Sequence, residues 1–253
     1  MGILFKYLDA EGGLKMLTNS NLQFTNAGEL NDPFDCHPAL INFSNVPKDK
    51  YRGNSKMVTL MSSCKYIKIR EKAWICSLSK IYNSLLMWAY YGNHRGVCIG
   101  IDMEKADVYL SRILCNTYIG AMKMEVQYRD IIERPDYFND EIDYFKYQLS
   151  TKAKDWEHEK EVRLILMDPS PVFSVMGLPF KPKDPNLTID WKVVRAYANI
   201  GRECFESLYL GIGLDIIQRK NIIEAALNCN PDIKIYQMKQ DPKAFRLKEE
   251  QIN

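Results

Sequence analysis

The chain has few histidines and no cysteine pair at a spacing typical of metal sites. Its three histidines are His37, His94 and His158, and none lies at metal-ligand spacing from another. The seven cysteines are an odd number and include no Cys-x-x-Cys pair, which argues against a disulfide framework and a zinc knuckle. We therefore expect no metal site, and reduced thiols in a cytoplasmic protein.

The sequence also lacks a long apolar run, a basic leader and an excess of charge of either sign. No run approaches the roughly 18 apolar residues that a membrane-spanning helix needs. There are 34 Lys and Arg residues against 32 Asp and Glu residues, so the net charge is only +2. That balance does not favour a nucleic acid or an anionic membrane as an obligatory partner. We expect no membrane partner, and the sequence leaves the oligomeric state open.

With 46% hydrophobic residues, the 253-residue chain can bury a substantial core, and we expect a single domain over residues 1–253. The hydrophobic patterns predict an α+β fold with split, mostly antiparallel sheets and peripheral helices. Strands are expected at 3–8, 22–25, 73–76, 96–101, 121–128, 162–167, 207–211 and 233–238, and helices at 11–18, 85–91, 136–150 and 215–227.

Two segments have a less certain pattern. Residues 65–72 are basic and alternate in polarity, which fits either a solvated edge strand or an amphipathic connector. Five of the eleven prolines fall between Asp168 and Asp190. This density predicts an extended surface excursion at 168–190, a candidate lid or partner-binding loop.

The most informative pattern is the pair of glutamates Glu159 and Glu161 at the start of the apolar run 162–167. Side chains at positions i and i+2 of an extended segment point to the same side, so both carboxylates can face one cleft. The alternative is an exposed strand edge on which Glu161 and Arg163 form a modest ion pair.

Two further elements give the glutamate pair its context. Ser77 and Ser79 flank Leu78 at the end of an apolar run, and Lys6 and Tyr7 lie in the first expected strand. The chain therefore carries, in order, a basic residue, a Ser-x-Ser element and a Glu-x-Glu element. Each element alone is a weak signal, and their order indicates a common site.

Aromatic residues at helical spacing form a third candidate feature. Trp88, Tyr91 and His94 step by three, and Arg95 follows. One interpretation is a wall on which a planar ligand ring stacks, with His94 or Arg95 on a phosphate. The other is ordinary core packing, because aromatic stripes at helical spacing usually pack.

The loop at 26–35 is rich in turn-forming residues. Asn31, Asp32 and Asp35 could supply oxygen atoms to a hard cation or to ribose hydroxyls. The Asn-Asp-Pro order also initiates turns without any further purpose, which is the favoured interpretation for Asp35.

These stretches resemble a large bacterial family of uncharacterised function, the domain of unknown function 2971. The resemblance extends over most of the chain and implies no particular reaction. The matching stretches are 5–7, 31–35, 76–79, 87–99 and 156–164.

A second resemblance is to the ADP-ribosyltransferases of the Arg, Ser-x-Ser, Glu-x-Glu type, in which NAD lies in a cleft between two small sheets. This resemblance implies an ADP-ribosyltransferase-like core, with Lys6 in place of the basic first-strand residue and Ser77 and Ser79 supporting the cleft. It further implies that Glu161 hydrogen-bonds the nicotinamide ribose and that Glu159 orients the acceptor.

The chain departs from that pattern in three respects: lysine replaces the usual arginine or histidine, Leu78 occupies the middle of the serine element, and the spacings are longer than in compact toxins. Under the resemblance, the catalytic candidates are Glu159 and Glu161. The candidates for contact with NAD are Lys6, Tyr7, Asn31, Asp32, Ser77, Ser79, Trp88, Tyr91, His94 and Arg95.

Three functions follow as hypotheses. The first is an NAD-consuming transferase or glycohydrolase, including a toxin or phage-defence effector whose acceptor is a protein or nucleic acid. Breaking the glycosidic bond of NAD develops positive charge on the ribose, which a fixed carboxylate stabilises. The second is a non-catalytic recognition module that uses residues 88–96 and the proline-rich excursion. The third is a metal-dependent nuclease built from Asp32, Asp35, Glu159, Glu161 and Lys6.

Overall fold

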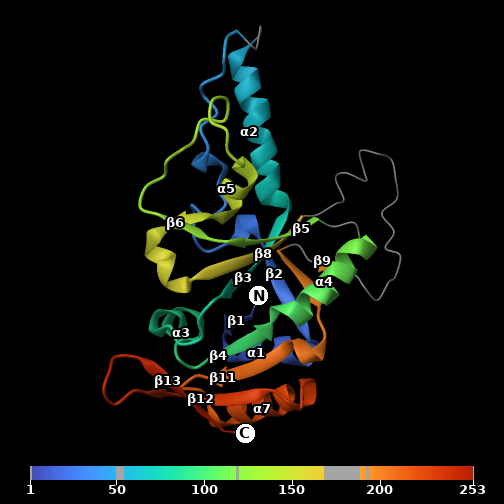
Figure 1. The fold of residues 1–253 in the computed structure, drawn as a ribbon, viewed down its shortest axis with the longest axis vertical. Helices are drawn as coiled ribbons and strands as arrows, with labels where there is room; N and C mark the ends of the chain where they lie inside the picture. The colour runs from blue at the N-terminus through green and yellow to red at the C-terminus, as the bar shows by residue number, and fades with distance from the viewer. Residues whose placement is uncertain (1, 50–53, 118–119, 168–188, 192–193, 253) are drawn as a thin grey trace.

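The computed structural model describes residues 2–49, 54–117, 120–167, 189–191 and 194–252. It confirms the α+β expectation, because helices surround a mostly antiparallel sheet (Figure 1). Among the described strands, β11 with β12 and β6 with β7 pair in parallel, and the other pairs are antiparallel.

The elements run along the chain as follows. The strands are β1 Ile3–Leu8, β2 Asn21–Asn26, β3 Ala73–Ser79, β4 Val97–Asp102, β5 Gly120–Glu125, β6 Gln127–Arg129, β7 Thr151–Ala153, β8 Glu161–Met167, β9 Ile189–Trp191, β10 Arg195–Asn199, β11 Phe205–Leu210, β12 Lys234–Gln240 and β13 Leu247–Gln251. The α-helices are α1 Ala10–Asn19, α2 Ser55–Lys72, α3 Leu85–Gly92, α4 Met103–Thr117, α5 Tyr144–Ser150 and α7 Ile216–Cys229. The short 3₁₀ helices are η1 Ala27–Glu29, η2 Pro38–Leu40, η3 Lys154–Glu159 and η4 Arg202–Cys204.

The large sheet has the strand order β13-β12-β11-β4-β1-β3-β2-β10-β9, and β8 and β5 extend it from β3. β1 pairs with β4 over its whole length, from Ile3 opposite Asp102 to Leu8 opposite Val97. With β3, however, β1 makes only the pair Phe5–Ser79. The sheet is therefore split between β1 and β3, which share a single paired position.

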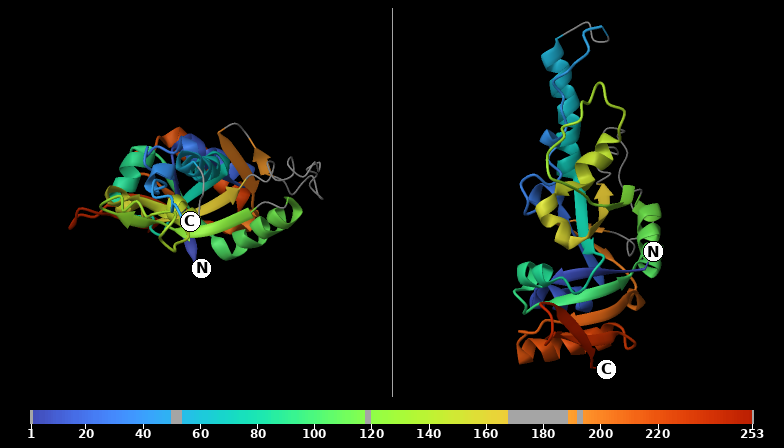
Figure 2. Two further views of the ribbon diagram at one scale, coloured as in Figure 1. Left: turned by 90° about the horizontal axis from the view of Figure 1, so that it is seen from above. Right: turned by 60° about the vertical axis from the view of Figure 1, so that its left-hand side comes forward.

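Apolar residues on the two faces of the sheet form separate cores, as strand alternation requires. In β1, Leu4 belongs to the main core beneath α1 and α7, whereas Tyr7 belongs to a second core with Trp88 of α3. A third core around Ile165 lies at the opposite half of the sheet. The two cores therefore pack α1 and α3 against opposite faces of β1. Figure 2 shows the molecule from two further sides, with the long helix α2 at one end in the right-hand view.

Residues 65–72 are neither an edge strand nor a connector, because they are the second half of the 18-residue helix α2. Asn54 caps the start of the helix, and its side chain accepts a hydrogen bond from the backbone NH of Lys56. Tyr66 is buried against the body of the protein. Residues 65–72 are helical because the helix starts upstream and is held by the packing of Tyr66, although their polarity alternates as in a strand.

The helix expected at 136–150 is shorter than predicted and consists of Tyr144–Ser150. The side chain of Asp136 accepts hydrogen bonds from the NH of Phe138 and the amide of Asn139, which forms a turn instead. Asp143 then caps the helix by accepting from the NH of Lys146.

The other strands and helices differ from expectation in detail. The strand expected at 121–128 is interrupted at residue 126 and forms β5 and β6. The sequence patterns gave no expectation for α4, β9, β10 or β13. The excursion at 168–190 lies almost wholly outside the described residues, which resume at 189. No helix in the described ranges is both long enough and apolar enough to cross a membrane.

Candidate functional site

The split between β1 and β3 is bridged by the side chain of Lys6. Its Nζ donates a hydrogen bond of 2.9 Å to the backbone carbonyl of Ser77. Because the strands separate beyond Phe5–Ser79, this carbonyl has no strand partner on β1 to pair with it. The lysine thus substitutes for part of a missing backbone ladder.

A groove of about 840 Å³ opens beside this bridge. Its walls come from β1, α1, β2 and β10, with Cys76 from β3 and Tyr91 from α3. Its charged lining residues are the cations Lys6, Lys15 and Arg195 and the anions Asp9 and Glu11. The groove is therefore polar at its rim, and its volume lies within the range of about 300–1,000 Å³ that is common for ligand sites.

Next to the groove, five charged side chains form what we call the buried charge cluster: Asp35, Lys152, Glu159, Glu161 and Arg163. Each is at most 6% exposed. Buried charges are tolerated when they are paired and hydrogen-bonded, and here three carboxylates face two cations. With every group ionised, the cluster carries one net negative charge.

Arg163 is the centre of one half of the cluster. Its Nη2 lies 2.7 Å from Oδ2 of Asp35, and its Nε lies 2.9 Å from Oε1 of Glu161. Its Nη1 donates to the carbonyl of Leu149 at 2.8 Å. The planar guanidinium therefore directs separate donors at two carboxylates and a carbonyl, which a lysine ammonium cannot reproduce.

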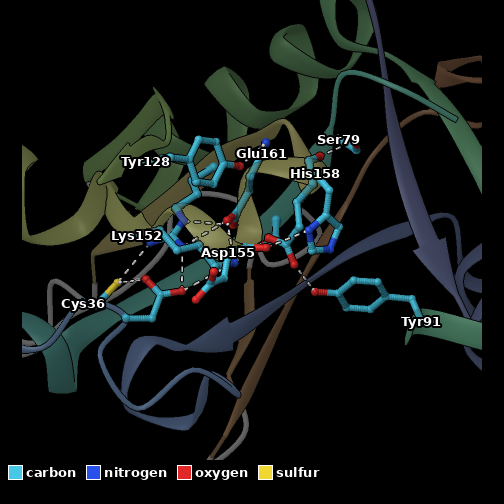
Figure 3. Close-up of polar contacts among 12 residues, drawn as sticks. Cys36, Ser79, Tyr91, Tyr128, Lys152, Asp155, His158 and Glu161 are labelled. Carbon is cyan, nitrogen blue, oxygen red and sulfur yellow. Dashed lines mark hydrogen bonds and ion pairs between the residues drawn. The ribbon is translucent and has the colours of Figure 1, made fainter. Parts of the chain in front are cut away.

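Lys152 is the centre of the other half. Its Nζ lies 2.5 Å from Oε2 of Glu159, 3.1 Å from Oε2 of Glu161 and 3.9 Å from Oδ2 of Asp35. Figure 3 shows Lys152 and Glu161 directed at each other, with Tyr91 reaching the cluster from the side opposite Tyr128. All three carboxylates therefore converge on one ammonium group.

Attraction between the opposite charges of the cluster determines which of its groups are ionised. Burial alone would raise the pKa of Glu161, but Arg163 and Lys152 outweigh it and hold that pKa well below its ordinary value. Burial would likewise lower the pKa of Lys152, whereas the attraction of Glu161, Glu159 and Asp35 raises it. Glu161 and Lys152 are therefore charged at neutral pH.

Glu159 and Glu161 converge, but not for the reason that the sequence suggested. Glu159 is the last residue of η3, and Lys160 has the left-handed conformation with φ of 46° and ψ of 50°. Only Glu161 belongs to β8. A turn rather than an extended segment brings the two carboxylates together, and neither faces open solvent.

The serine element ties β3 to this turn. The hydroxyl of Ser79 donates to the backbone carbonyl of Glu159 at 2.6 Å, and it accepts from the NH of Ile81. The hydroxyl of Ser77 hydrogen-bonds Glu161 and helps to keep it charged. The Ser-x-Ser and Glu-x-Glu elements are thus in contact, whereas Lys6 lines the groove and contacts only the backbone carbonyl of Ser77 among them.

Tyr91 connects the cluster to the groove. It lines the groove, and its hydroxyl donates a 2.6 Å hydrogen bond to Oε1 of Glu159. Burial and the nearby charge of Glu159 raise the pKa of Tyr91, so the phenol stays protonated and acts as the donor. The groove contains no carboxylate of the cluster directly, and Tyr91 is its polar link to them.

Trp88 and Tyr7 lie largely in the second core. Trp88 is 1% exposed, its indole NH donates to the carbonyl of Tyr82, and its ring meets Tyr7 edge-on at 5.5 Å. Tyr7 also lines the groove, and its hydroxyl donates to the carbonyl of Ile81. The packing interpretation therefore describes Trp88, whose ring is covered and does not line the groove.

His94 and Arg95 lie outside the groove. His94 lines a separate cavity of about 650 Å³ with Leu85, Ile212 and the loop between β12 and β13. Its Nδ1 is buried and has no hydrogen-bond partner among the described residues. Arg95 is exposed. Trp88, Tyr91 and His94 therefore do not form one wall, because Trp88 packs in the second core, Tyr91 lines the groove and His94 lines the second cavity.

The 31–35 loop contributes one member to the cluster. Asp32 is buried, and its Oδ1 accepts from the NH of Phe34, which is turn chemistry. Asn31 is exposed. Asp35, which the sequence favoured as a simple turn residue, instead pairs with Arg163. The turn positions this carboxylate for a contact more than a hundred residues away in the chain.

Lys152 was not among the candidates, and Arg163 was considered only as part of an exposed ion pair. No local pattern distinguishes Lys152 from a surface lysine, because its burial follows from three carboxylates supplied by distant segments. Arg163 follows Glu161 by two positions in a strand, and its place amid an apolar run was a usable signal of burial.

The carboxylates of the cluster are occupied by protein cations. In the described part of the chain, no group of three or more His, Cys, Asp or Glu side chains is arranged to hold a metal ion. Lys6, the proposed fifth member of a nuclease site, bonds a backbone carbonyl at the groove. The geometry thus gives the nuclease hypothesis no preformed ligand set.

Comparison with known proteins identifies one family. A family described as "Protein of unknown function (DUF2971)" matches residues 87–164, which include Tyr91, Lys152, Glu159, Glu161 and Arg163. This supports the resemblance noted from the sequence, although the matched range is shorter than the stretches that suggested it. No curated protein and no solved structure matches the chain.

Proposed function

We propose that the chain is an NAD-consuming enzyme that transfers or hydrolyses ADP-ribose, with NAD bound as substrate in the groove beside the β1–β3 split. The observation that carries the proposal is the position of Tyr91, which lines the groove and donates its hydroxyl hydrogen bond to Glu159 in the buried cluster. A buried, net negative cluster is thereby coupled to a site of ligand size.

The groove offers chemistry suited to a dinucleotide. Arg195 supplies positive charge for a pyrophosphate, Lys15 is paired with Glu11 in the same groove, and Lys6 lies at the floor of the split. The rings of Tyr91 and Tyr197 provide surfaces on which an adenine or nicotinamide ring can stack. Asp9 supplies a carboxylate for hydroxyl groups. These contacts would orient NAD with its scissile bond towards Tyr91.

The reaction breaks the bond between C1′ of the ribose and the nicotinamide nitrogen. The bonding electron pair leaves with nicotinamide, which becomes neutral, and positive charge develops on the ribose. The single net negative charge of the cluster lies behind Tyr91 and stabilises that charge more in the transition state than in the ground state. Arg163 and Lys152 keep Glu161 ionised and so maintain the field.

The incoming nucleophile is water or a hydroxyl of a macromolecular acceptor, a protein or a nucleic acid. As its oxygen bonds to C1′, its proton passes to the oxygen of Tyr91, and the proton of Tyr91 passes to Glu159. This assigns the proton-accepting role to Glu159 and a positioning role to Glu161. Such a reaction would suit a toxin or phage-defence effector, which would act by consuming the NAD of a cell or by modifying a macromolecule in it.

The direct test measures release of nicotinamide from labelled NAD. Tyr91→Phe and Glu159→Gln should each lower the rate by about 10² or more, the contribution typical of general acid-base groups. Tyr90→Phe is the matched control, because the neighbouring Tyr90 is exposed and lies outside the groove. Wild-type protein that neither binds NAD in calorimetry nor releases nicotinamide would remove the proposal, as would equal rates for Tyr91→Phe and Tyr90→Phe.

A recognition module is the second candidate, and the cavity beside His94 favours it. Leu85 and Ile212 line this cavity with substantial exposure, and Phe245 in the adjoining loop is fully exposed. Such apolar exposure around a concave site is typical of binding surfaces. This function would require neither NAD nor Tyr91, so the same release assay separates it from the enzymatic proposal.

A further inference from the structure

Strands β2 and β10 present a row of polar side chains to the groove. The two strands pair antiparallel, with Gln23 directly opposite Tyr197. Two residues further along each strand, Asn21 lies opposite Asn199. The residues that alternate with these on both strands are fully buried in the main core. The polar row therefore lies on the opposite face of the two strands from that core, and all four of its members line the groove.

The polar row has hydrogen-bonding groups that the protein itself does not use. Within the described ranges, none of the four side chains makes a hydrogen bond to another residue. Each carboxamide offers both donors and an acceptor, and the ring of Tyr197 offers a flat apolar face. The ligand that suits this row therefore has a planar ring that carries donors and acceptors on its edge.

Positive charge lies beside the polar row. Arg195 precedes Tyr197 by two residues on β10 and so lies on the same face, about 7 Å away along the strand. Lys15 of α1 is close enough to both residues to interact with them electrostatically. Because Lys15 is also paired with Glu11, Arg195 is the better candidate to bind a phosphate. A ring-binding position and an anion-binding position are thus neighbours on one strand.

We propose that Gln23 and Tyr197 bind the adenine ring of NAD and select it over other purines. This inference rests on the proposed function, which places the scissile bond of the nicotinamide ribose at Tyr91. Adenine is at the other end of the dinucleotide. In the sheet order, β10 is three strand positions away from β1, against which α3 and its Tyr91 pack. An NAD molecule with its nicotinamide at Tyr91 therefore has its adenine end available to β2 and β10.

The edge of adenine matches a single carboxamide. Its N6 amino group donates and its N7 accepts, so the oxygen and the nitrogen of the Gln23 side chain can bond both atoms. Side chains directly opposite each other in an antiparallel pair have Cβ atoms about 4.5–5.5 Å apart, so a ring stacked on Tyr197 lies within reach of Gln23. Hypoxanthine has acceptors at both positions, and one carboxamide can satisfy only one of them. The site should therefore prefer adenine.

Release of nicotinamide from NAD and from nicotinamide hypoxanthine dinucleotide tests the inference. The two substrates differ in the purine, and their scissile bonds are identical. Wild-type protein should favour NAD by about tenfold or more in kcat/KM, chiefly through a lower KM. Gln23→Leu should lower kcat/KM for NAD by a similar factor and abolish the preference. Calorimetric dissociation constants of the two dinucleotides give the same comparison without relying on turnover.

Two further variants separate recognition of the purine edge from other effects. Gln218→Leu on α7 is the matched control, because Gln218 is an exposed glutamine outside the groove. It should retain both the rate with NAD and the preference for adenine. Tyr197→Leu should weaken binding of both dinucleotides by the same factor, because stacking does not distinguish the two purines. Circular dichroism confirms that each variant is folded.

Failure of the adenine assignment can be told apart from failure of the proposed function. Wild-type protein that binds and cleaves both dinucleotides equally well would overturn the assignment and leave the NAD-consuming reaction in place. A folded Gln23→Leu variant that keeps the full preference for NAD would also overturn it. Protein that neither binds nor cleaves either dinucleotide would remove both proposals.

Discussion

The hydroxyl of Tyr91 and a carboxylate oxygen of Glu159 are 2.6 Å apart, although the two residues are separated by 68 positions in the chain. This contact joins the surface of the groove to the buried charge cluster. The carboxylate has its other oxygen on Lys152, so the phenol completes its coordination. A change in the position of Tyr91 at the groove therefore alters the hydrogen bonding of Glu159 in the cluster.

Tyr91→Phe should destabilise the fold, in addition to lowering any activity. It removes a hydrogen bond to a charged acceptor, which is worth about 1.5–3 kcal/mol when its partner is buried. Urea unfolding measures the loss. Tyr90→Phe serves as the control on an exposed ring, and equal stability of the two variants would show that the Tyr91 contact is energetically unimportant.

Arg163→Met should be strongly destabilising, by about 3–5 kcal/mol, because it leaves Asp35 and Glu161 buried without their main cation. Lys160→Met removes an exposed ion pair to Glu157, and should cost no more than about 1 kcal/mol. Denaturant midpoints compared at neutral pH decide between them. Similar midpoints would contradict the buried character of the Arg163 pairs.

Stability should fall as the pH is lowered below the ordinary pKa of Glu161, which is 4.5. The pKa of this group is depressed in the folded protein, so its contribution is present above the unfolded value and is lost as the pH falls towards the folded value. Urea unfolding of wild type and Glu161→Gln from pH 7 to 3 should show a stability gap that narrows below pH 4.5. A constant gap would argue against linkage through Glu161.

Gly96→Ala should disturb the end of α3 and with it Tyr91. A Cβ at this position would lie 2.1 Å from the carbonyl oxygen of Leu8 and 3.1 Å from Cα of Gly92. Relieving such overlap costs about 1–3 kcal/mol. Gly2→Ala is a suitable control, because an added Cβ there meets nothing within 4 Å. In thermal denaturation, Gly96→Ala should lower the midpoint temperature of unfolding, whereas Gly2→Ala should leave it unchanged.

The sequence predicts those elements whose patterns agree with their packing. β1, β4, β8 and β11 are expected because apolar runs of strand length bounded by polar residues leave few alternatives. The helix α2 was missed because its stability rests on the cap at Asn54 and on Tyr66, while its outer face is apolar instead of polar. The pattern of polar and apolar residues therefore does not predict which side of α2 is buried.

The candidate site is predicted in part for a related reason. Glu159, Glu161, Ser77 and Ser79 attract notice because short spacings place them together in the chain, and the structure does bring their elements into contact. The position of Lys152 depends on the meeting of segments far apart in sequence. No single segment of the sequence therefore predicts that Lys152 is buried beside three carboxylates.

The position of β1 in the sheet has a consequence for biosynthesis. This strand is synthesised before both of its partners, which are residues 97–102 of β4 and Ser79 of β3. Its hydrogen-bonding edges stay open until those residues have been made, an interval in which they can pair with other chains. Nascent protein should consequently be most vulnerable to aggregation before β4 emerges, and slow translation of the segment between β1 and β4 would prolong that exposure.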